Sequence, residues 1–470
     1  MADFLDRDAT DQLAALRSGD ISARELLLAA VERAERTADV NAVVSRDVER
    51  ALREAKLVDE KRARGDEVGM LAGLPMTVKD TLDVEGLPGS AGLKTLLNRK
   101  AVDACVVERV RKAGAIVWGK TNTPANAGDW QTYNALYGVT NNPLDQTRTP
   151  GGSSGESAAA LAAGITALEI GADIAGSLRI PASYCGVFAH KPTFGVISQR
   201  GLVPPAVRAA DIDLAVVGPM ARSARDLQLL YNTIADHPDA TRKRATLRTL
   251  RVGLWIDEPA FVLDHPVHDT IRAFAERLSA AGSVVSPISA PVPPGVLLST
   301  YTMLLFAIMG ASVPPLAGVL FEALRGPARV ATAMGASPMS WAQGVLGYAA
   351  RHRDWLAANE TRAHLRGEMI TFFQRYDILI CPCAPTVAFP HDHRPINWRT
   401  LSTSTGDRFS YLRMLEWSAL ATTCGLPATA IPAGLAASGL PVGVQIIGPP
   451  GSNTFVIAVA EAIEKALQAA

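Results

Sequence analysis

At residues 151–157 the chain reads Gly-Gly-Ser-Ser-Gly-Glu-Ser, and at 158–164 it continues Ala-Ala-Ala-Leu-Ala-Ala-Gly. A glycine-rich turn lets the backbone approach a ligand closely and aim its N–H groups. The small residues behind it predict a tightly packed helix, whose free N–H groups favour developing negative charge. The stretch is not a P-loop, because no Gly-Lys-Ser/Thr follows the glycines. Taken alone, it is also compatible with a purely structural loop.

A second turn of small residues, Ala-Asp-Ile-Ala-Gly-Ser, follows at 172–177. Such a run lets consecutive N–H groups point at one oxygen, as an oxyanion hole requires. Asp173 and Arg179 flank the turn with opposite charges and could hold it by pairing across it. A structural turn is the alternative.

One lysine upstream, Lys79, lies in an apolar setting, Leu-Pro-Met-Thr-Val-Lys-Asp at 74–80. Serine is a poor nucleophile until a base takes its proton, and a lysine stripped of water can be that base. A free lysine titrates near pH ~10.4, so this role requires Lys79 to be buried. Together with Ser153 and Ser177, it indicates acyl transfer without histidine.

A competing interpretation comes from residues 151–155, which also match the G-x-S-x-G nucleophile elbow of α/β-hydrolases. An esterase of that fold would need a downstream aspartate and a histidine as base. His391 is the best candidate for that histidine, although nothing around it marks it out. As metal ligands, His391 and His393 lack a third partner nearby.

The composition is that of an ordinary globular protein: 470 residues, 48% hydrophobic and 20% charged, a length that allows two or three domains. Lys and Arg number 46, as do Asp and Glu, so no basic surface predicts a nucleic-acid partner. The five scattered cysteines are typical of reduced, buried thiols, and Cys381 and Cys383 stand too close for a usual zinc site. We expect neither a metal nor a cofactor.

Short apolar strands alternate with helical patterns along the chain, which indicates an α/β sandwich around a mostly buried sheet. The expected strands are 74–78, 115–118, 187–190, 214–217, 252–255, 378–380, 428–431 and 442–447. Four regions are expected: N-terminal helices at 1–64, a core with the motifs at 65–240, a largely helical pocket region at 241–375, and the rest of the core at 376–470.

One stretch, residues 278–321, contains no charged residue. Its most apolar part, 296–313, is about long enough to cross a bilayer, but prolines stand at both of its ends. We expect a buried helix that lines the substrate pocket, with a dimer face or a membrane patch as alternatives. Stable membrane insertion is not expected. Because the N-terminus is acidic and lacks an apolar segment, no secretory signal is expected and the predicted location is cytoplasmic.

The motifs around Lys79, 151–155 and 173–179 together resemble the amidase signature family. The resemblance continues at 118–122, 148–150, 181–187, 190–193 and 440–448, strongly over about 65–235 and more weakly over about 375–450. It implies an α/β/α sandwich with a mixed central sheet covered by helices, and a variable helical middle region.

The resemblance also implies a Ser–cis-Ser–Lys triad. Ser177 would attack the amide carbonyl, Ser153, preceded by a cis peptide bond, would relay the proton, and Lys79 would be the base. Ser154 would support the hydrogen-bond network. The oxyanion would be held by the backbone N–H groups of Ile174, Ala175, Gly176 and Ser177. Two departures from the family pattern are Ala172, which lacks a supporting hydroxyl, and Ala175, which adds a methyl group beside the turn.

Family members cleave many amides, and some cleave carbamates, so the resemblance does not fix the substrate. An apolar or aromatic linear amide is favoured here, with esters or carbamates as side activities. Candidate pocket residues are Trp130, Tyr133, Met303, Phe306 and Trp417. The rival function is the glutaminase subunit of a tRNA-dependent amidotransferase, and a homodimer is compatible with the sequence.

Overall fold

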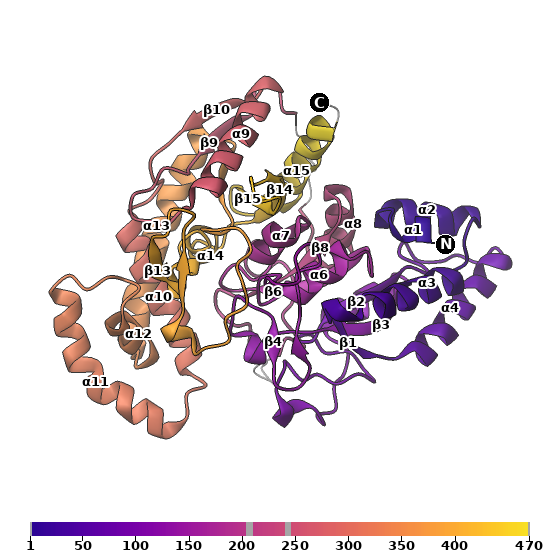
Figure 1. The fold of residues 1–470 in the computed structure, drawn as a ribbon, viewed down its shortest axis with the longest axis horizontal. Helices are drawn as coiled ribbons and strands as arrows, with labels where there is room; N and C mark the ends of the chain where they lie inside the picture. Colours follow the sequence, from indigo (N-terminus) through magenta and orange to yellow (C-terminus); the bar gives the residue numbers. More distant parts are fainter. Residues whose placement is uncertain (1, 204–209, 240–245, 469–470) are drawn as a thin grey trace.

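A mixed sheet of eight strands forms the centre of the computed structural model, which describes residues 2–203, 210–239 and 246–468 (Figure 1). The strands in spatial order are β10 (Val284–Pro287), β9 (Arg251–Leu254), β11 (Ile378–Pro382), β15 (Pro441–Ile447), β14 (Ala428–Leu435), β7 (Phe188–Lys191), β8 (Val216–Ala221) and β6 (Leu168–Asp173). The pairs β10–β9 and β9–β11 are parallel, and the other neighbours are antiparallel. The predicted mixed central sheet is confirmed.

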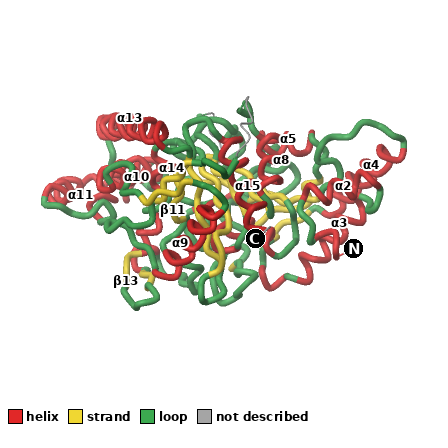
Figure 2. Tube along the Cα trace, turned by 90° about the horizontal axis from the view of Figure 1, so that it is seen from above, coloured by secondary structure: helices red, strands yellow, loops and turns green. Residues whose placement is uncertain are grey.

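Side chains of each strand alternate between the two faces of this sheet, as the pleat dictates. On β11, Ile378 and Ile380 pack with α8 (Ala224–Ile234), α9 (His265–Ala280) and α15 (Asn453–Gln468). Leu379 and Cys381 pack on the opposite face with α7 (Arg179–Cys185) and α14 (Ala419–Thr423). Figure 2 shows the strands enclosed by helices. The α/β/α sandwich is confirmed.

A smaller sheet in the N-terminal part carries Lys79. Its order is β1 (Val43–Arg46), β3 (Ile116–Thr121) and β2 (Pro75–Lys79), with β2 parallel to β3. All residues of β2 are buried, and Lys79 ends the strand. The helices of this part are α1 (Ala2–Leu5), α2 (Ala9–Ser18), α3 (Ala23–Arg36), α4 (Val48–Ala63) and α5 (Cys105–Lys112). Ser22 and Glu25 form a capping box at the start of α3, as the sequence predicts.

Strand β6 was not expected from the sequence, although it leads directly into the second turn. It reads Leu-Glu-Ile-Gly-Ala-Asp, and its charged Glu169 obscures the apolar pattern of a buried strand. In the fold Glu169 is fully buried and accepts a hydrogen bond from Thr77 on β2. Strands β1 and β10 were also missed. The predicted boundary at 240/241 lies outside the described residues.

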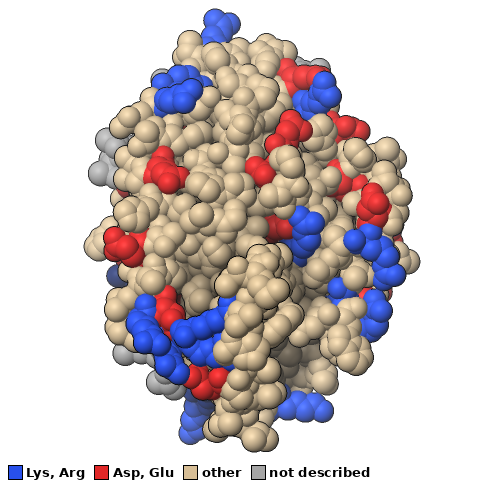
Figure 3. All heavy atoms as spheres, turned by 90° about the vertical axis from the view of Figure 1, so that its left-hand side faces the viewer, with Lys and Arg blue, Asp and Glu red and all other residues tan. Residues whose placement is uncertain are grey.

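Four helices form one end of the molecule: α10 (Pro294–Gly310), α11 (Pro315–Ala333), α12 (Trp341–Tyr348) and α13 (His352–Arg375) (Figure 1). The uncharged stretch at 278–321 includes the end of α9, β10, α10 and the start of α11. Within the described ranges, no helix combines the length and apolarity needed to cross a membrane. Helix α11 exposes four large apolar side chains: Leu316, Val319, Leu320 and Val330. Figure 3 shows few charged residues over much of this end of the molecule.

Candidate active site

Lys79 reaches both serines of the first turn. Its Nζ lies 2.8 Å from Ser153 Oγ and 2.9 Å from Ser154 Oγ. The side chain is fully buried, because β2 lies between its neighbour β3 and the central sheet. A buried amine that touches a serine hydroxyl can exchange a proton with it.

The electrostatic surroundings of Lys79 suit a base. Burial lowers the pKa of its ammonium group to about 8, although the buried carboxyls of Glu156, Asp173 and Glu169 act in the opposite direction. Burial in turn raises the pKa of Glu169 to about 7 and that of Glu156 well above its usual range. A neutral amine is therefore accessible to Lys79 near neutral pH, as serine activation requires.

The first turn leads into α6 (Gly155–Ala162), and the peptide bond between Gly152 and Ser153 is cis. Gly152 admits no side chain, because a Cβ there would lie 2.4 Å from the carbonyl oxygen of Asp129. Ser154 links the two turns: its N–H donates to the Ser177 carbonyl at 3.1 Å, and its hydroxyl donates to the Ala172 carbonyl at 3.2 Å. The two serine turns thus lie side by side.

In the second turn, Asp173 uses some of the N–H groups that the sequence assigns to an oxyanion hole. The Gly176 N–H donates to Asp173 Oδ1 at 2.9 Å, and the N–H of Leu178 donates to Oδ2 at 3.1 Å. Within the described residues, the N–H groups of Ile174, Ala175 and Ser177 donate no hydrogen bond. The geometry therefore favours three of the four predicted donors, with Gly176 shaping the turn.

Asp173 itself is held by Arg179, as the sequence suggests. The guanidinium binds both carboxylate oxygens at 3.0 Å, and both side chains are buried. Burial alone would raise the pKa of Asp173, but the charge and hydrogen bonds of Arg179 outweigh it and hold the pKa below its usual value. Arg179 also donates to Gln445 Oε1 at 2.8 Å and Thr422 Oγ1 at 2.9 Å, so the turn is tied to β15 and α14.

Replacing Arg179 with methionine is expected to lower the free energy of unfolding by about 3–5 kcal/mol, because it leaves the Asp173 carboxylate buried and unpaired. Urea unfolding followed by tryptophan fluorescence measures the loss. Arg200→Met is the control, since its ion pair with Glu108 is half exposed and should contribute less than about 1 kcal/mol. Equal losses in the two variants would contradict this account of the turn.

The predicted pocket residues divide into different environments. The Trp130 indole N–H donates to the Ala175 carbonyl at 2.8 Å, so this side chain contacts the second turn. Tyr133, on β4 (Tyr133–Asn134), stacks on His393 at a centroid distance of 4.1 Å and binds Arg399. Trp130 and Tyr133 thus remain candidates for contact with a substrate.

The other three predicted pocket residues, Met303, Phe306 and Trp417, pack against apolar side chains. Met303 packs against the apolar cluster of α11 and α12, and Phe306 stacks on Tyr348 of α12 at 5.3 Å. Trp417 has no exposed surface: it packs against Trp255 and Phe261 and donates to the Val262 carbonyl. These three side chains contribute to the core and to the helical region, and their role in a substrate pocket stays a prediction.

Two groups near the turns escaped the sequence analysis. Tyr301 on α10 is fully buried, and its hydroxyl donates to the Ile174 carbonyl at 2.8 Å. Arg399 binds Asp129 Oδ2 at 2.7 Å, and the hydroxyl of Tyr411 donates to Asp129 Oδ1 at 2.7 Å. No local motif marks these residues, because their partners lie more than a hundred positions away in the chain.

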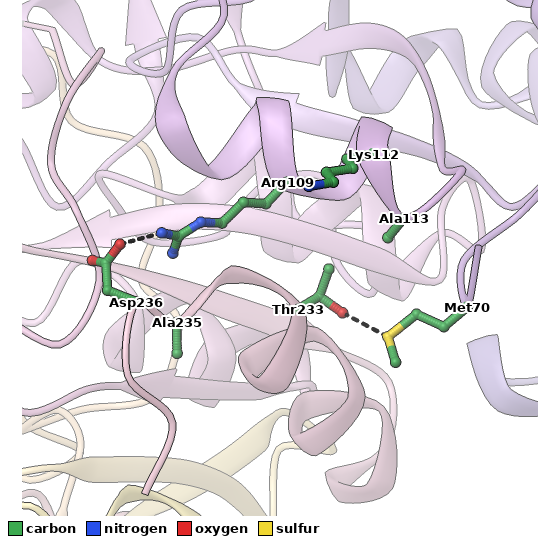
Figure 4. Close-up of a pocket in the computed structure, with 7 residues that line it drawn as sticks. All are labelled: Met70, Arg109, Lys112, Ala113, Thr233, Ala235 and Asp236. Carbon is green, nitrogen blue, oxygen red and sulfur yellow. Dashed lines mark hydrogen bonds and ion pairs between the residues drawn. The ribbon is translucent and has the colours of Figure 1, made fainter.

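A separate surface hollow of about 430 Å³ lies between α5 and α8 (Figure 4). Arg109 is paired with Asp236 in it, and the Thr233 hydroxyl contacts Met70. None of the predicted site residues lines it. In the described residues no group of three or more His, Cys, Asp or Glu side chains could hold a metal ion, and neither Ser153 nor Ser177 hydrogen-bonds a histidine.

A known protein family matches most of the chain. The Amidase family model matches residues 25–457. The chain belongs to the amidase family. This membership confirms the resemblance drawn from the motifs and, with it, amide hydrolysis as the coarse function. It sets aside the Ser-His-Asp esterase built on His391.

Individual members of the amidase family are similar over almost the whole chain. One subunit of the glutamyl-tRNA(Gln) amidotransferase of Cyanothece sp. is 33% identical over 479 residues, covering 96% of each chain. Among solved structures, 6-aminohexanoate cyclic dimer hydrolase is 29% identical, with a TM-score of 0.79, and covers 98% of this chain and 97% of its own. A protein from a vestigial complex, described as revealing the origins of an s-triazine catabolic enzyme, is 28% identical with a TM-score of 0.81, and 98% of both chains is covered.

Proposed function

We propose that this amidase hydrolyses a linear carboxylic amide through an acyl-enzyme on Ser177, with Ser153 as proton relay and Lys79 as base. The observation that carries the proposal is the contact of the buried Lys79 Nζ with Ser153 Oγ at 2.8 Å. The adjacent turn supports it, because the N–H groups of Ile174, Ala175 and Ser177 are available next to the proposed nucleophile.

The proposed reaction has two halves. Ser177 Oγ bonds to the amide carbon while its proton passes to Ser153 and the proton of Ser153 passes to Lys79. The three free N–H groups hold the tetrahedral oxyanion. When the C–N bond breaks, Lys79 returns a proton through Ser153 to the leaving amine. Water then adds to the acyl-enzyme by the same route, and the carboxylic acid leaves Ser177.

An apolar or aryl amide is the substrate class that we favour. Ile174 and Ala175 of the second turn are partly buried and pack against the apolar cluster that contains Trp130 and Tyr301. Two buried arginines of this region, Arg179 and Arg399, are each bound to an aspartate, so their charges are already matched. Neither of these two arginines is therefore free to pair with the second carboxylate of a dicarboxylate substrate.

The value of kcat/KM is expected to rise by about tenfold per pH unit below pH 8 and to level off above it. The reason is that the neutral Lys79 amine is the proposed base and its pKa is about 8. Glu156, Glu169 and Asp173 face Lys79 from α6 and β6, so the measured midpoint belongs to the whole cluster. A pH–rate profile recorded where far-ultraviolet circular dichroism shows a folded protein tests this. A rate that falls from pH 6 to pH 9 would refute the lysine base.

A glutaminase subunit of an amidotransferase is the second candidate, favoured by the 33% identity to the glutamyl-tRNA(Gln) amidotransferase protein of Cyanothece sp.. The two functions separate in a hydrolysis panel of aliphatic primary amides, aryl amides, anilides, long acyl amides, glutamine and matched esters. The purified chain is assayed alone, with Ser177→Ala as the blank. Turnover of anilides or aryl amides supports the stand-alone amidase. Activity on glutamine only, and only with a co-purified partner, would support the amidotransferase role.

A further inference from the structure

The carbonyls of residues 174–177 in the second turn are each bound by a donor from outside the turn. Two donors are backbone N–H groups: that of Ile180 binds the Gly176 carbonyl at 2.8 Å, and that of Ser154 binds the Ser177 carbonyl at 3.1 Å. The other two are side chains, namely the Tyr301 hydroxyl on the Ile174 carbonyl and the Trp130 indole on the Ala175 carbonyl, both at 2.8 Å.

Each of these side-chain contacts fixes a peptide plane. In a trans peptide the C=O of one residue and the N–H of the next point in opposite directions. The Ile174 carbonyl shares its plane with the Ala175 N–H, which has no partner among the described residues. The Ala175 carbonyl shares its plane with the Gly176 N–H, which is already bound to Asp173. Of the two planes held by side chains, the one held by Tyr301 is therefore the one that carries a free donor.

We propose that Tyr301 is a positioning residue for the oxyanion hole: by binding the Ile174 carbonyl it aims the Ala175 N–H at the oxyanion of the transition state. The inference rests on the proposed function. Tyr301 suits the task because it is fully buried, and burial raises the pKa of its phenol, so the hydroxyl keeps its proton. Tyr301 also connects α10 of the helical region to the second turn.

The test is Tyr301→Phe, which removes the hydroxyl and keeps the ring. The expected result is a roughly 10-fold fall in kcat with little change in KM, smaller than the ~10²–10³-fold loss when a donor is removed outright. Tyr231→Phe is the matched control: Tyr231 is equally buried, and its hydroxyl lies 3.4 Å from Asp239, away from the turn. Thermal unfolding of both variants accounts for any loss of stability.

A second readout separates positioning from a general structural effect. A phenylalkyl trifluoromethyl ketone adds to the Ser177 oxygen, and the carbonyl oxygen becomes an oxyanion while the serine proton goes to Lys79. The matching secondary alcohol forms no such adduct. Tyr301→Phe should lower the affinity for the ketone by about the same factor as it lowers kcat. Its affinity for the alcohol should stay unchanged.

The possible outcomes are distinct. If the wild-type protein turns over amides and binds the ketone, and Tyr301→Phe does both equally well, the role of Tyr301 is rejected and the proposed function stands. If the variant bound the ketone and the alcohol more weakly by the same factor, the role of Tyr301 would also be rejected, because a distorted pocket would then explain the loss. If the wild-type protein neither turns over an amide nor binds the ketone, the proposed function fails, and the inference fails with it.

Discussion

Replacing Ser177 with alanine should lower kcat by on the order of 10⁴–10⁶-fold and leave the free energy of unfolding nearly unchanged. The hydroxyl is the proposed nucleophile, so its loss removes the covalent route altogether. Within the described residues, the Ser177 hydroxyl makes no hydrogen bond that the fold would lose. The measurements are steady-state kinetics on the best substrate of the panel and urea unfolding of both proteins.

Ser183 offers a matched control for this result. It is as buried as Ser177, at 5% exposure, and lies on the helix that follows the same turn. Its hydroxyl accepts the Gly443 N–H at 2.8 Å, so Ser183→Ala should reduce stability and keep kcat. The two variants should therefore behave in opposite ways: Ser177→Ala loses activity and keeps stability, whereas Ser183→Ala loses stability and keeps activity. A Ser177→Ala rate within about tenfold of wild type would show that another group forms the acyl-enzyme.

Replacing Lys79 is expected to lower kcat by roughly 10³–10⁴-fold, because the variant loses its general base, and general base catalysis accelerates reactions by up to about 10⁴-fold. Lys79→Ala removes the amine but also opens a cavity, because the side chain is fully buried. Lys79→Met nearly fills the same volume, so a similar loss in both variants assigns the effect to the amine. In Lys79→Met, the remaining activity should also lose its rise toward alkaline pH. The kinetics of both variants are recorded across the pH range.

Lys191 is the control for burial itself. It too is fully buried, and burial lowers its pKa to about 7, but its amine donates to the carbonyls of Pro192 and Leu426 and to neither serine. Lys191→Met should therefore change stability and leave the pH–rate profile in place. If Lys79→Met kept the wild-type profile, Lys79 could not be the base.

The local parts of the site could be predicted from the sequence. The two serine turns and Lys79 each lie within a short motif, because a tight backbone turn and a buried lysine place strict demands on their immediate neighbours. The strands of the central sheet were found where apolar residues predominate and no charged residue intervenes, as in β14 and β15. Strand β6 was missed because Glu169, matched by Thr77 in the fold, looks like a surface residue in the sequence.

The long-range parts could not be predicted. Tyr301 and the Ile174 carbonyl are 127 positions apart, and nothing near either of them specifies the contact. Met303 and Phe306 stand on the same helix as Tyr301, yet they pack against the neighbouring helices α11 and α12. The packing of the whole helical region decides which face of α10 meets the turn. This packing cannot be predicted from the composition of the helix.

The proposed base and nucleophile come from two different sheets. Lys79 ends β2 of the small sheet, whereas Ser177 follows β6 of the central sheet. Across the junction Thr77 binds Glu169, and the hydroxyls of Thr121 and Ser157 lie 3.2 Å apart. The distance between base and nucleophile is thus set by how one layer docks on the other. Substitutions at these contacts between the two layers can lower the catalytic rate without changing a catalytic group. The activity of such variants therefore reports how accurately the two layers are docked.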